Sequence, residues 1–155
     1  MIEKSLRLAK LDDVPVLMNF ARHFLAASPY KGFRFASSKG EEFLRKAITG
    51  ALKDHVVLVA LHDGKPIGFL VGAALEPVFS SVKIATELGW WIEPDARRTK
   101  ASFLIYSAYE DWAARIGCDA VQGAYLPGVS PELDEFYKRR GYAQVESSYL
   151  KRLKI

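Results

Sequence analysis

The chain has 155 residues, 50% of them apolar and 26% charged, which is the composition of one ordinary globular domain. Lys and Arg number 22 against 18 Asp and Glu, and the two signs intersperse, so we rank a nucleic-acid partner as unlikely. The single cysteine excludes a disulfide framework and a cysteine zinc site, and the three histidines lack metal-ligand spacing, so we expect no metal.

The sequence shows no signal for a membrane or a secretory pathway. No apolar run approaches the roughly 18–20 residues that span a bilayer. The first ten residues mix charged and apolar side chains, unlike the continuous apolar region of a signal peptide. We therefore expect a cytoplasmic protein without a membrane partner.

The first half of the chain begins with a short strand and continues with two helices. Asp12 is expected to cap the first helix, and Ser38 with Glu41 fits a capping box for the second. The spacing of apolar residues then changes from the helical period to the pattern of strands, and Asp63-Gly64 is a typical hairpin turn. The predicted segments are a strand at 5–9, a helix at 13–27, a helix from 38 and strands at 55–61, 66–75 and 84–92.

In the second half, helices and short strands alternate. Thr99 is a plausible cap for the third helix, and Gly117 and Gly141 are expected to end the last two helices. The order β-α-α-β-β-β-α-β-α-β-β predicts one α+β domain over residues 1–155. The remaining predicted segments are a helix between 99 and 117, a strand at 120–124, a helix between 130 and 141 and strands at 142–145 and 149–153.

The most informative stretch is 88–102, where a strand runs into a basic turn that opens a helix. Backbone N–H groups at a helix N-terminus and the helix dipole together bind anions. Arg97, Arg98 and Lys100 add positive charge, and the small residues Ala101 and Ser102 allow a phosphate to approach the backbone. A pyrophosphate ligand fits this turn, although a solvated basic surface is the alternative.

Two motifs in this order resemble the GNAT superfamily of N-acetyltransferases. Ile92-Glu93-Pro94 followed by 97–102 resembles the family's V-x-P and Q/R-x-x-G-x-G/A, and 87–92 resembles the E-I-G-Y-W-I run of members that acetylate ribosomal-protein termini. The stretch 137–142 resembles the late Y-x-x-x-G-F/Y. The resemblance covers nearly the whole chain. It implies a mixed, largely antiparallel central sheet flanked by helices, with acetyl-CoA as co-substrate.

The resemblance also implies the cofactor contacts. The backbone of Trp90 and Ile92 is expected to bind the pantetheine arm, with one of Trp90 and Trp91 packed in the core and the other on the opposite face. The expected pyrophosphate site is the turn formed by Arg97, Arg98, Thr99, Lys100, Ala101 and Ser102. Lys100 and Ser102 replace the two motif glycines. Lys100 is strained if the turn demands a positive φ and otherwise points out toward phosphate.

Acetyl transfer to an amine requires a deprotonated amine, in-line attack and a proton for the leaving thiolate. Tyr137 resembles the tyrosine that supplies this proton; alternatively, its ring packs beside Phe136 with a solvated hydroxyl. Glu87 is the candidate base, acting directly or through a water, and an exposed strand glutamate is the alternative. Glu93 is expected to face solvent.

The acceptor is expected to be a primary amine of a small molecule or of a peptide or protein, contacting the segment 30–38. Phe33, Arg34 and Phe35 either contact an aromatic or acidic acceptor or pin this segment to the core. The two replaced glycines motivate an alternative function, a non-catalytic acyl-CoA-binding module or sensor. Many members form dimers, so a homodimer is one assembly that the resemblance implies.

Overall fold

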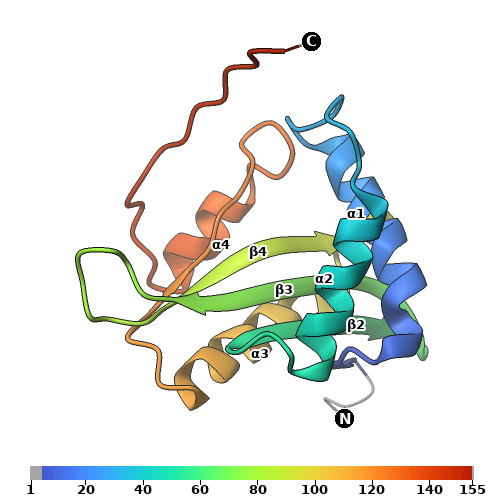
Figure 1. Ribbon diagram of the computed structural model, residues 1–155, viewed down its shortest axis with the longest axis horizontal. Helices are drawn as coiled ribbons and strands as arrows, with labels where there is room; N and C mark the ends of the chain where they lie inside the picture. The colour runs from blue at the N-terminus through green and yellow to red at the C-terminus, as the bar shows by residue number, and fades with distance from the viewer. Residues whose placement is uncertain (1–4, 155) are drawn as a thin grey trace. The chain divides into compact units, whose positions relative to one another are not determined.

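The computed structural model describes residues 5–154, which fall into two compact units, Met1–Ala124 and Tyr125–Ile155. We describe each unit by itself, and the prediction of a single domain over residues 1–155 stays a prediction. The first unit contains β1 (Leu6–Leu8), the 3-10 helix η2 (Leu11–Asp13), α1 (Val14–Ala27), α2 (Ser37–Thr49), β2 (His55–His62), β3 (Lys65–Leu75), β4 (Ile84–Ile92), the 3-10 helix η3 (Pro94–Ala96), α3 (Lys100–Arg115) and β5 (Ala120–Gln122) (Figure 1). The second unit contains α4 (Leu133–Arg139).

The strands of the described residues form one sheet in the order β1-β2-β3-β4-β5. The first three pairings are antiparallel and β4 pairs with β5 in parallel, so the predicted α+β class with a largely antiparallel sheet is confirmed. Asp63 (φ 49°) and Gly64 (φ 75°) turn β2 into β3. Two successive positive φ values match the twist of a two-residue hairpin, as the sequence predicts.

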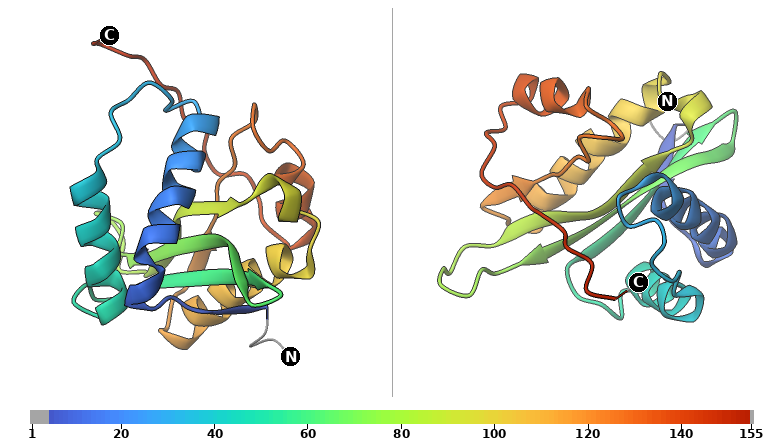
Figure 2. Two further views of the ribbon diagram at one scale, coloured as in Figure 1. Left: turned by 90° about the vertical axis from the view of Figure 1, so that its right-hand side faces the viewer. Right: turned by 90° about the horizontal axis from the view of Figure 1, so that it is seen from above.

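Helices cover both faces of the sheet in the first unit, with α1 and α2 on one face and α3 on the other (Figure 2). Val57 and Val59 of β2 pack with Leu17 of α1 and Leu44 of α2. The opposite face approaches α3 so closely that a Cβ on Gly72 would lie 2.7 Å from the ring of Tyr109. Burial on both faces explains why β2 is a continuous apolar run rather than an alternating one.

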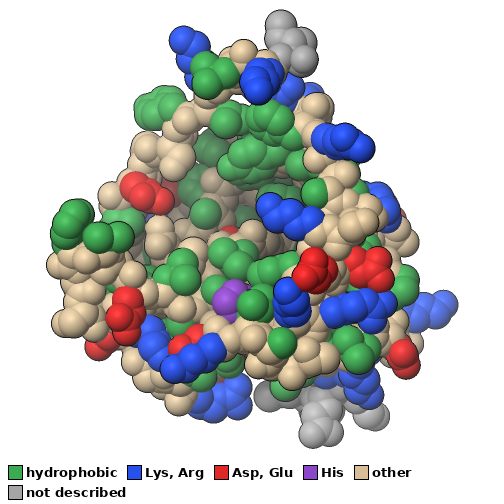
Figure 3. All heavy atoms as spheres, viewed as in Figure 1, with side chains coloured by type: hydrophobic (Ala, Val, Ile, Leu, Met, Phe, Trp, Pro, Cys, Tyr) green, Lys and Arg blue, Asp and Glu red, His purple; other side chains and the backbone are tan. Residues whose placement is uncertain are grey.

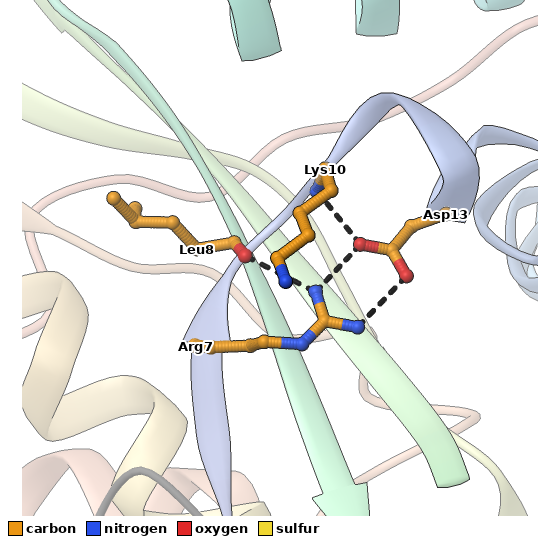
Figure 4. A network of polar contacts seen from close by, with 4 residues as sticks. All are labelled: Arg7, Leu8, Lys10 and Asp13. Atoms are coloured by element: carbon orange, nitrogen blue, oxygen red, sulfur yellow. Dashed lines mark hydrogen bonds and ion pairs between the residues drawn. The ribbon is translucent and has the colours of Figure 1, made fainter.

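The entry to α1 differs from the sequence prediction. The helix is preceded by Asp13 rather than capped by Asp12, and Asp13 makes no side-chain cap. Its carboxylate instead accepts two bonds from the Arg7 guanidinium, at 2.6 and 3.0 Å, and one from the Lys10 N–H at 2.7 Å (Figure 4). The bond from Arg7 is the main reason that the pKa of Asp13 lies below its usual range. The first strand therefore holds the start of α1 by a bidentate ion pair.

The capping box predicted for α2 is wrong. The helix begins at Ser37, after Ala36, and no side chain caps it. Ser38 lies inside the first turn, where its hydroxyl is not placed to cap, and Glu41 bonds Arg45 at 2.9 Å along the same helix. The i,i+4 ion pair takes the carboxylate that a capping box would have used.

The second unit gathers aromatic rings around α4. The Tyr137 ring lies 5.3 Å from that of Tyr142 and 5.5 Å from that of Phe136. The strands predicted at 142–145 and 149–153 are wrong, because residues 142–154 form no ladder. Val145 and Tyr149 are 80% and 97% exposed. A β-branched or aromatic residue favours a strand only when neighbouring strands cover its side chain, and here nothing in the described chain does so.

Smaller differences concern element ends. The strand predicted at 120–124 pairs only as far as Gln122, and the last helix begins at Leu133 rather than near Ser130. The described residues include no helix that is both long and apolar enough to cross a bilayer.

Candidate functional site

The candidate site starts at the end of β4, where η3 and a short turn lead into α3. Three side chains of this turn bind its own backbone. The Thr99 hydroxyl donates to the Ala96 carbonyl at 2.7 Å, and the buried Ser102 hydroxyl lies 2.7 Å from both the Arg97 and Thr99 carbonyls. Ser102 therefore closes the turn from inside rather than presenting its hydroxyl to a ligand.

Arg97 also turns inward. Its Nε donates to the Ile92 carbonyl at 3.0 Å, and its guanidinium lies 4.7 Å from the centre of the Trp91 ring. Both contacts fasten the turn to the last residues of β4. The Arg97 charge thus helps to hold the turn as well as to make it basic.

The turn leaves backbone donors available at the start of α3. The N–H groups of Thr99 and Ser102 donate to the Ala96 and Thr99 carbonyls at 3.0 and 3.2 Å. In the described chain no hydrogen bond uses the N–H groups of Arg98, Lys100 or Ala101. These three donors and the helix dipole suit an anion.

Lys100, where the family motif has glycine, is the first residue of α3 and has no positive φ. The Lys100 and Arg98 side chains are both exposed. Neither replacement of a motif glycine therefore strains the turn. Of the two alternatives predicted for Lys100, the structure has the side chain pointing outward.

The backbone of β4 alternates in direction along the strand. The Glu93 N–H donates to Ile67 of the β3 side at 2.8 Å. By the alternation of an antiparallel pair, the backbone groups of Trp90 and Ile92 then face the β5 side. In the described part of the chain, the ladder between β4 and β5 ends at the pair Thr86 and Gln122.

A bulge interrupts β4 just before this stretch. Val71 pairs with Gly89 and Gly72 pairs with Glu87, so Leu88 is the extra residue on β4. A bulge bends a strand and increases its local twist. It lies beyond the last residue pair of the β4–β5 ladder.

The two tryptophans of β4 point to opposite faces, as the sequence predicts. Trp91 is buried, with its ring 6.4 Å from that of Phe24 of α1, whereas the ring of Trp90 lies 4.8 Å from that of Tyr106 of α3. Their side chains anchor the strand on both faces. The backbone between them remains the part that faces the β5 side.

Glu87 lies on the face that α3 covers, because its partner Gly72 points at Tyr109. It is half-buried and surrounded by protein atoms, and loss of hydration raises the pKa of its carboxyl to about 8. Its pKa lies near the value that suits a base at neutral pH.

One contact near the site was missed by the sequence analysis. Glu93, expected to face solvent, is half-buried, and its Oε1 lies 2.6 Å from Nδ1 of His23 in α1. The His23 ring also lies 6.5 Å from that of Trp91. These two residues are 70 positions apart, and Glu93 stands at the variable position of its motif, so no local signal relates them.

The structure thus brings together the turn 97–102, the backbone of β4 and the end of α1, all within the first unit. Tyr137 belongs to the second unit, where it is buried among aromatic rings. Its role as the acid stays a prediction.

The segment between α1 and α2 is exposed. Phe33 is 42% exposed, and the guanidinium of Arg22 lies 4.8 Å from the centre of the Phe35 ring. An open hollow of about 310 Å³ is lined by Arg22, Leu25, Ala26, Lys31, Gly32 and Phe35. Phe35 therefore holds the segment against α1, whereas Phe33 and Arg34 extend toward solvent.

Comparison with known proteins gives one sequence match to a family model. The model of the acetyltransferase (GNAT) family matches residues 22–143. The curated proteins include no sequence match to the chain.

Several solved structures share the fold. An aminoglycoside acetyltransferase from an uncultured soil metagenomic sample, in complex with trehalose, is 20% identical with a TM-score of 0.71, covering 100% of each chain. A ribosomal-protein-alanine N-acetyltransferase from Brucella melitensis is 17% identical with a TM-score of 0.68, covering 96% of this chain and 99% of that one. A predicted acetyltransferase with acetyl-CoA from Clostridium acetobutylicum is 12% identical with a TM-score of 0.75, covering 96% and 95%.

Proposed function

Because the chain belongs to the GNAT family of acetyltransferases, we propose that it transfers an acetyl group from acetyl-CoA to a primary amine of a small molecule or of a peptide or protein. The observation that carries this proposal is the turn before α3. It presents the N–H groups of Arg98, Lys100 and Ala101 together at the start of a 16-residue helix.

The turn suits the pyrophosphate of coenzyme A. Backbone N–H groups supply directed donors, and the exposed Arg98 and Lys100 side chains supply charge. The N–H of Ile92 faces the β5 side of β4 and would bind the pantetheine arm together with the backbone of Trp90. The thioester supplies an activated acetyl group. The chain's own residues supply binding, orientation and proton transfer.

Glu87 is the proposed base. Poor hydration raises its pKa to about 8, so its carboxylate can hold the proton taken from an ammonium group, directly or through a water. Tyr137 is the proposed acid, which donates its phenolic proton to the leaving thiolate. Attack by the amine forms the new C–N bond, and loss of the thiolate breaks the C–S bond.

The second candidate function is a non-catalytic acyl-CoA-binding module, which the loss of both motif glycines suggested. Two observations weaken this argument from the lost glycines. Lys100 has no positive φ, and the Ser102 hydroxyl closes the turn rather than blocking it. A donor site built without these glycines is compatible with turnover.

Calorimetry with acetyl-CoA tests the donor site. We expect binding by the intact chain and about tenfold weaker binding by Arg98→Glu, since the substitution sets a carboxylate against phosphate. Arg115→Glu reverses an exposed charge in the last turn of α3 and is the matched control. Equal affinity of Arg98→Glu and Arg115→Glu would overturn the site.

Thiol release during incubation with a panel of amines tests turnover. Loss of release in Tyr137→Phe with acetyl-CoA binding retained is expected for an acid. Tight binding with no release on any amine would favour the non-catalytic module.

A further inference from the structure

Charge is distributed very unevenly at the α1 end of the first unit. Residues 14–40 contain no Asp or Glu, yet they include Arg22, Lys31, Arg34 and Lys39. This stretch comprises α1, the connecting segment and the first turn of α2. In a chain with 18 acidic residues, an acid-free stretch of this length makes the surface locally positive.

Nearby acidic residues have basic partners of their own. Glu41 pairs with Arg45 at 2.9 Å, and Glu42 pairs with Lys46 at 2.7 Å. Figure 3 shows red and blue side chains interleaved over α2. At the end of β4, Glu93 is in contact with His23. The adjoining carboxylates are therefore already engaged.

Among the described residues, the partners of Arg22 are neutral. Its guanidinium donates to Asn19 Oδ1 at 3.2 Å and to Ser37 Oγ at 3.4 Å, and it stacks on Phe35. These contacts fix the group at the wall of the 310 Å³ hollow without cancelling its charge. The hollow combines this fixed cation with apolar walls from Leu25, Ala26 and Phe35.

The hollow is connected to the proposed donor site through α1. Phe24 and His23, next to Arg22 in sequence, contact Trp91 and Glu93 at the end of β4. The end of β4 and the wall of the hollow are therefore both formed against the same turn of α1.

We propose that the amine acceptor carries a carboxylate or another anionic group, held at the hollow by Arg22, with the exposed Arg34 of the same segment adding positive charge; this inference rests on the proposed acetyltransferase function. A polycationic acceptor, such as an aminoglycoside or a polyamine, meets like charge at the same place. Complementary charge attracts and orients one class, and like charge rejects the other.

The test compares acceptors of opposite charge. The peptides Ala-Glu-Glu-Ala and Ala-Arg-Arg-Ala, both amidated, each offer one primary amine and represent peptide acceptors, and glutamate and spermidine represent small ones. We expect kcat/KM about tenfold higher for the anionic member of whichever pair is used. The preference should shrink as salt rises from about 0.01 M to about 0.15 M, because the Debye length falls from about 30 to about 8 Å.

Arg34→Glu should reduce the preference at least fivefold, that is by about 1 kcal/mol, and Arg22→Gln should reduce it less. Arg115→Glu, with the same change in net charge away from the segment, should leave it unchanged. An equal or higher rate with the cationic acceptors, or a preference that Arg34→Glu does not alter, would overturn the inference.

Failure of the inference is distinguishable from failure of the proposed function. If acetyl-CoA binds and cationic amines are acetylated at least as fast as anionic ones, the proposed acetyltransferase function stands and the proposed class of acceptor is wrong. If acetyl-CoA binds but no amine is turned over, peptide binding to the CoA complex is measured instead. Tighter binding of the acidic peptide then supports the hollow, and tighter binding of the basic peptide overturns it.

Discussion

The turn between β4 and α3 and the segment between α1 and α2 are both basic, but they use their side chains in opposite ways. In the turn, Arg97, Thr99 and Ser102 bind the protein's own backbone. In the segment, Phe33 and Arg34 are exposed to solvent. The turn therefore offers backbone N–H groups in fixed positions, whereas the segment offers side chains. The first arrangement suits a ligand shared by a family, and the second suits a ligand particular to one member.

This difference gives a rule for mutations. Substitutions in and under the turn should change both the stability of the protein and its affinity for acetyl-CoA. Substitutions in the segment should change the choice of acceptor and little else. The next three predictions concern the turn and the strands that lead into it, from the largest expected effect to the smallest, and the last of them tests this rule directly.

Gly68→Val is expected to have the largest effect. A Cβ on Gly68 would lie 2.3 Å from the Trp91 carbonyl oxygen and 2.8 Å from the Ile92 Cα, and backbone atoms cannot give way as a flexible side chain does. We expect a loss of about 3 kcal/mol in the free energy of unfolding, measured with urea. Gly89→Ala is the control, since its added Cβ meets no described atom within 4 Å. Equal midpoints of urea unfolding for the two variants would contradict the close approach of Gly68 to the backbone of β4.

Glu87→Gln should change the pH dependence of both stability and rate. The folded-state pKa of about 8 lies above the unfolded value near 4.3. Between these values the unfolded chain releases a proton that the folded chain retains, so stability falls as pH rises, by at most about 1.4 kcal/mol per pH unit. Gln removes this slope, so its unfolding free energy should vary less between pH 5 and pH 8.

The same substitution should lower kcat about a hundredfold and remove its rise toward pH 8, if Glu87 is the base. Acetyl-CoA affinity should not change, because no donor contact is assigned to the Glu87 side chain. A pH–rate profile that is unaltered in Glu87→Gln would remove the base role even if stability changes.

Ser102→Ala should have a smaller effect that still couples stability to donor binding. Loss of the bonds to the Arg97 and Thr99 carbonyls should cost about 1 kcal/mol of unfolding free energy. Acetyl-CoA affinity should fall severalfold, because the N–H groups before α3 are then held less firmly. Ser38→Ala, at an exposed serine in the first turn of α2, is the control and should change neither quantity. Weaker binding without any loss of stability would separate the two effects and refute the rule.

Periodicity and turn chemistry predicted most of the fold. The run 55–61, the Asp63-Gly64 turn and the strand 84–92 depend on local preferences that the tertiary structure reinforces. The caps predicted for the first two helices were wrong: Asp13 rather than Asp12 precedes α1, and the carboxylates of Asp13 and Glu41 pair with Arg7 and Arg45. The glycines predicted to end the last two helices, Gly117 and Gly141, do follow α3 and α4 with positive φ. The strands predicted at 142–145 and 149–153 rested on propensity, which cannot supply the neighbouring strand that a ladder requires.

The candidate site was predictable in outline and not in detail. The basic turn before α3 follows from its sequence, because a cluster of arginines between a strand and a helix is a local signal. The inward direction of Arg97 depends on Trp91 and Ile92 folding back beneath it. The contact of His23 with Glu93 joins positions 70 residues apart. Interactions of this kind arise only once the sheet and α1 have packed.

The hairpin at Asp63-Gly64 also bears on how the molecule folds. Each pairing within the β2–β3–β4 meander joins strands that are consecutive in the chain, and only a two-residue turn separates β2 from β3. Closing such a short connection costs little chain entropy, and local contacts favour rapid folding. During synthesis, the strand that leads into the basic turn can therefore find its partners while α3 is still being made.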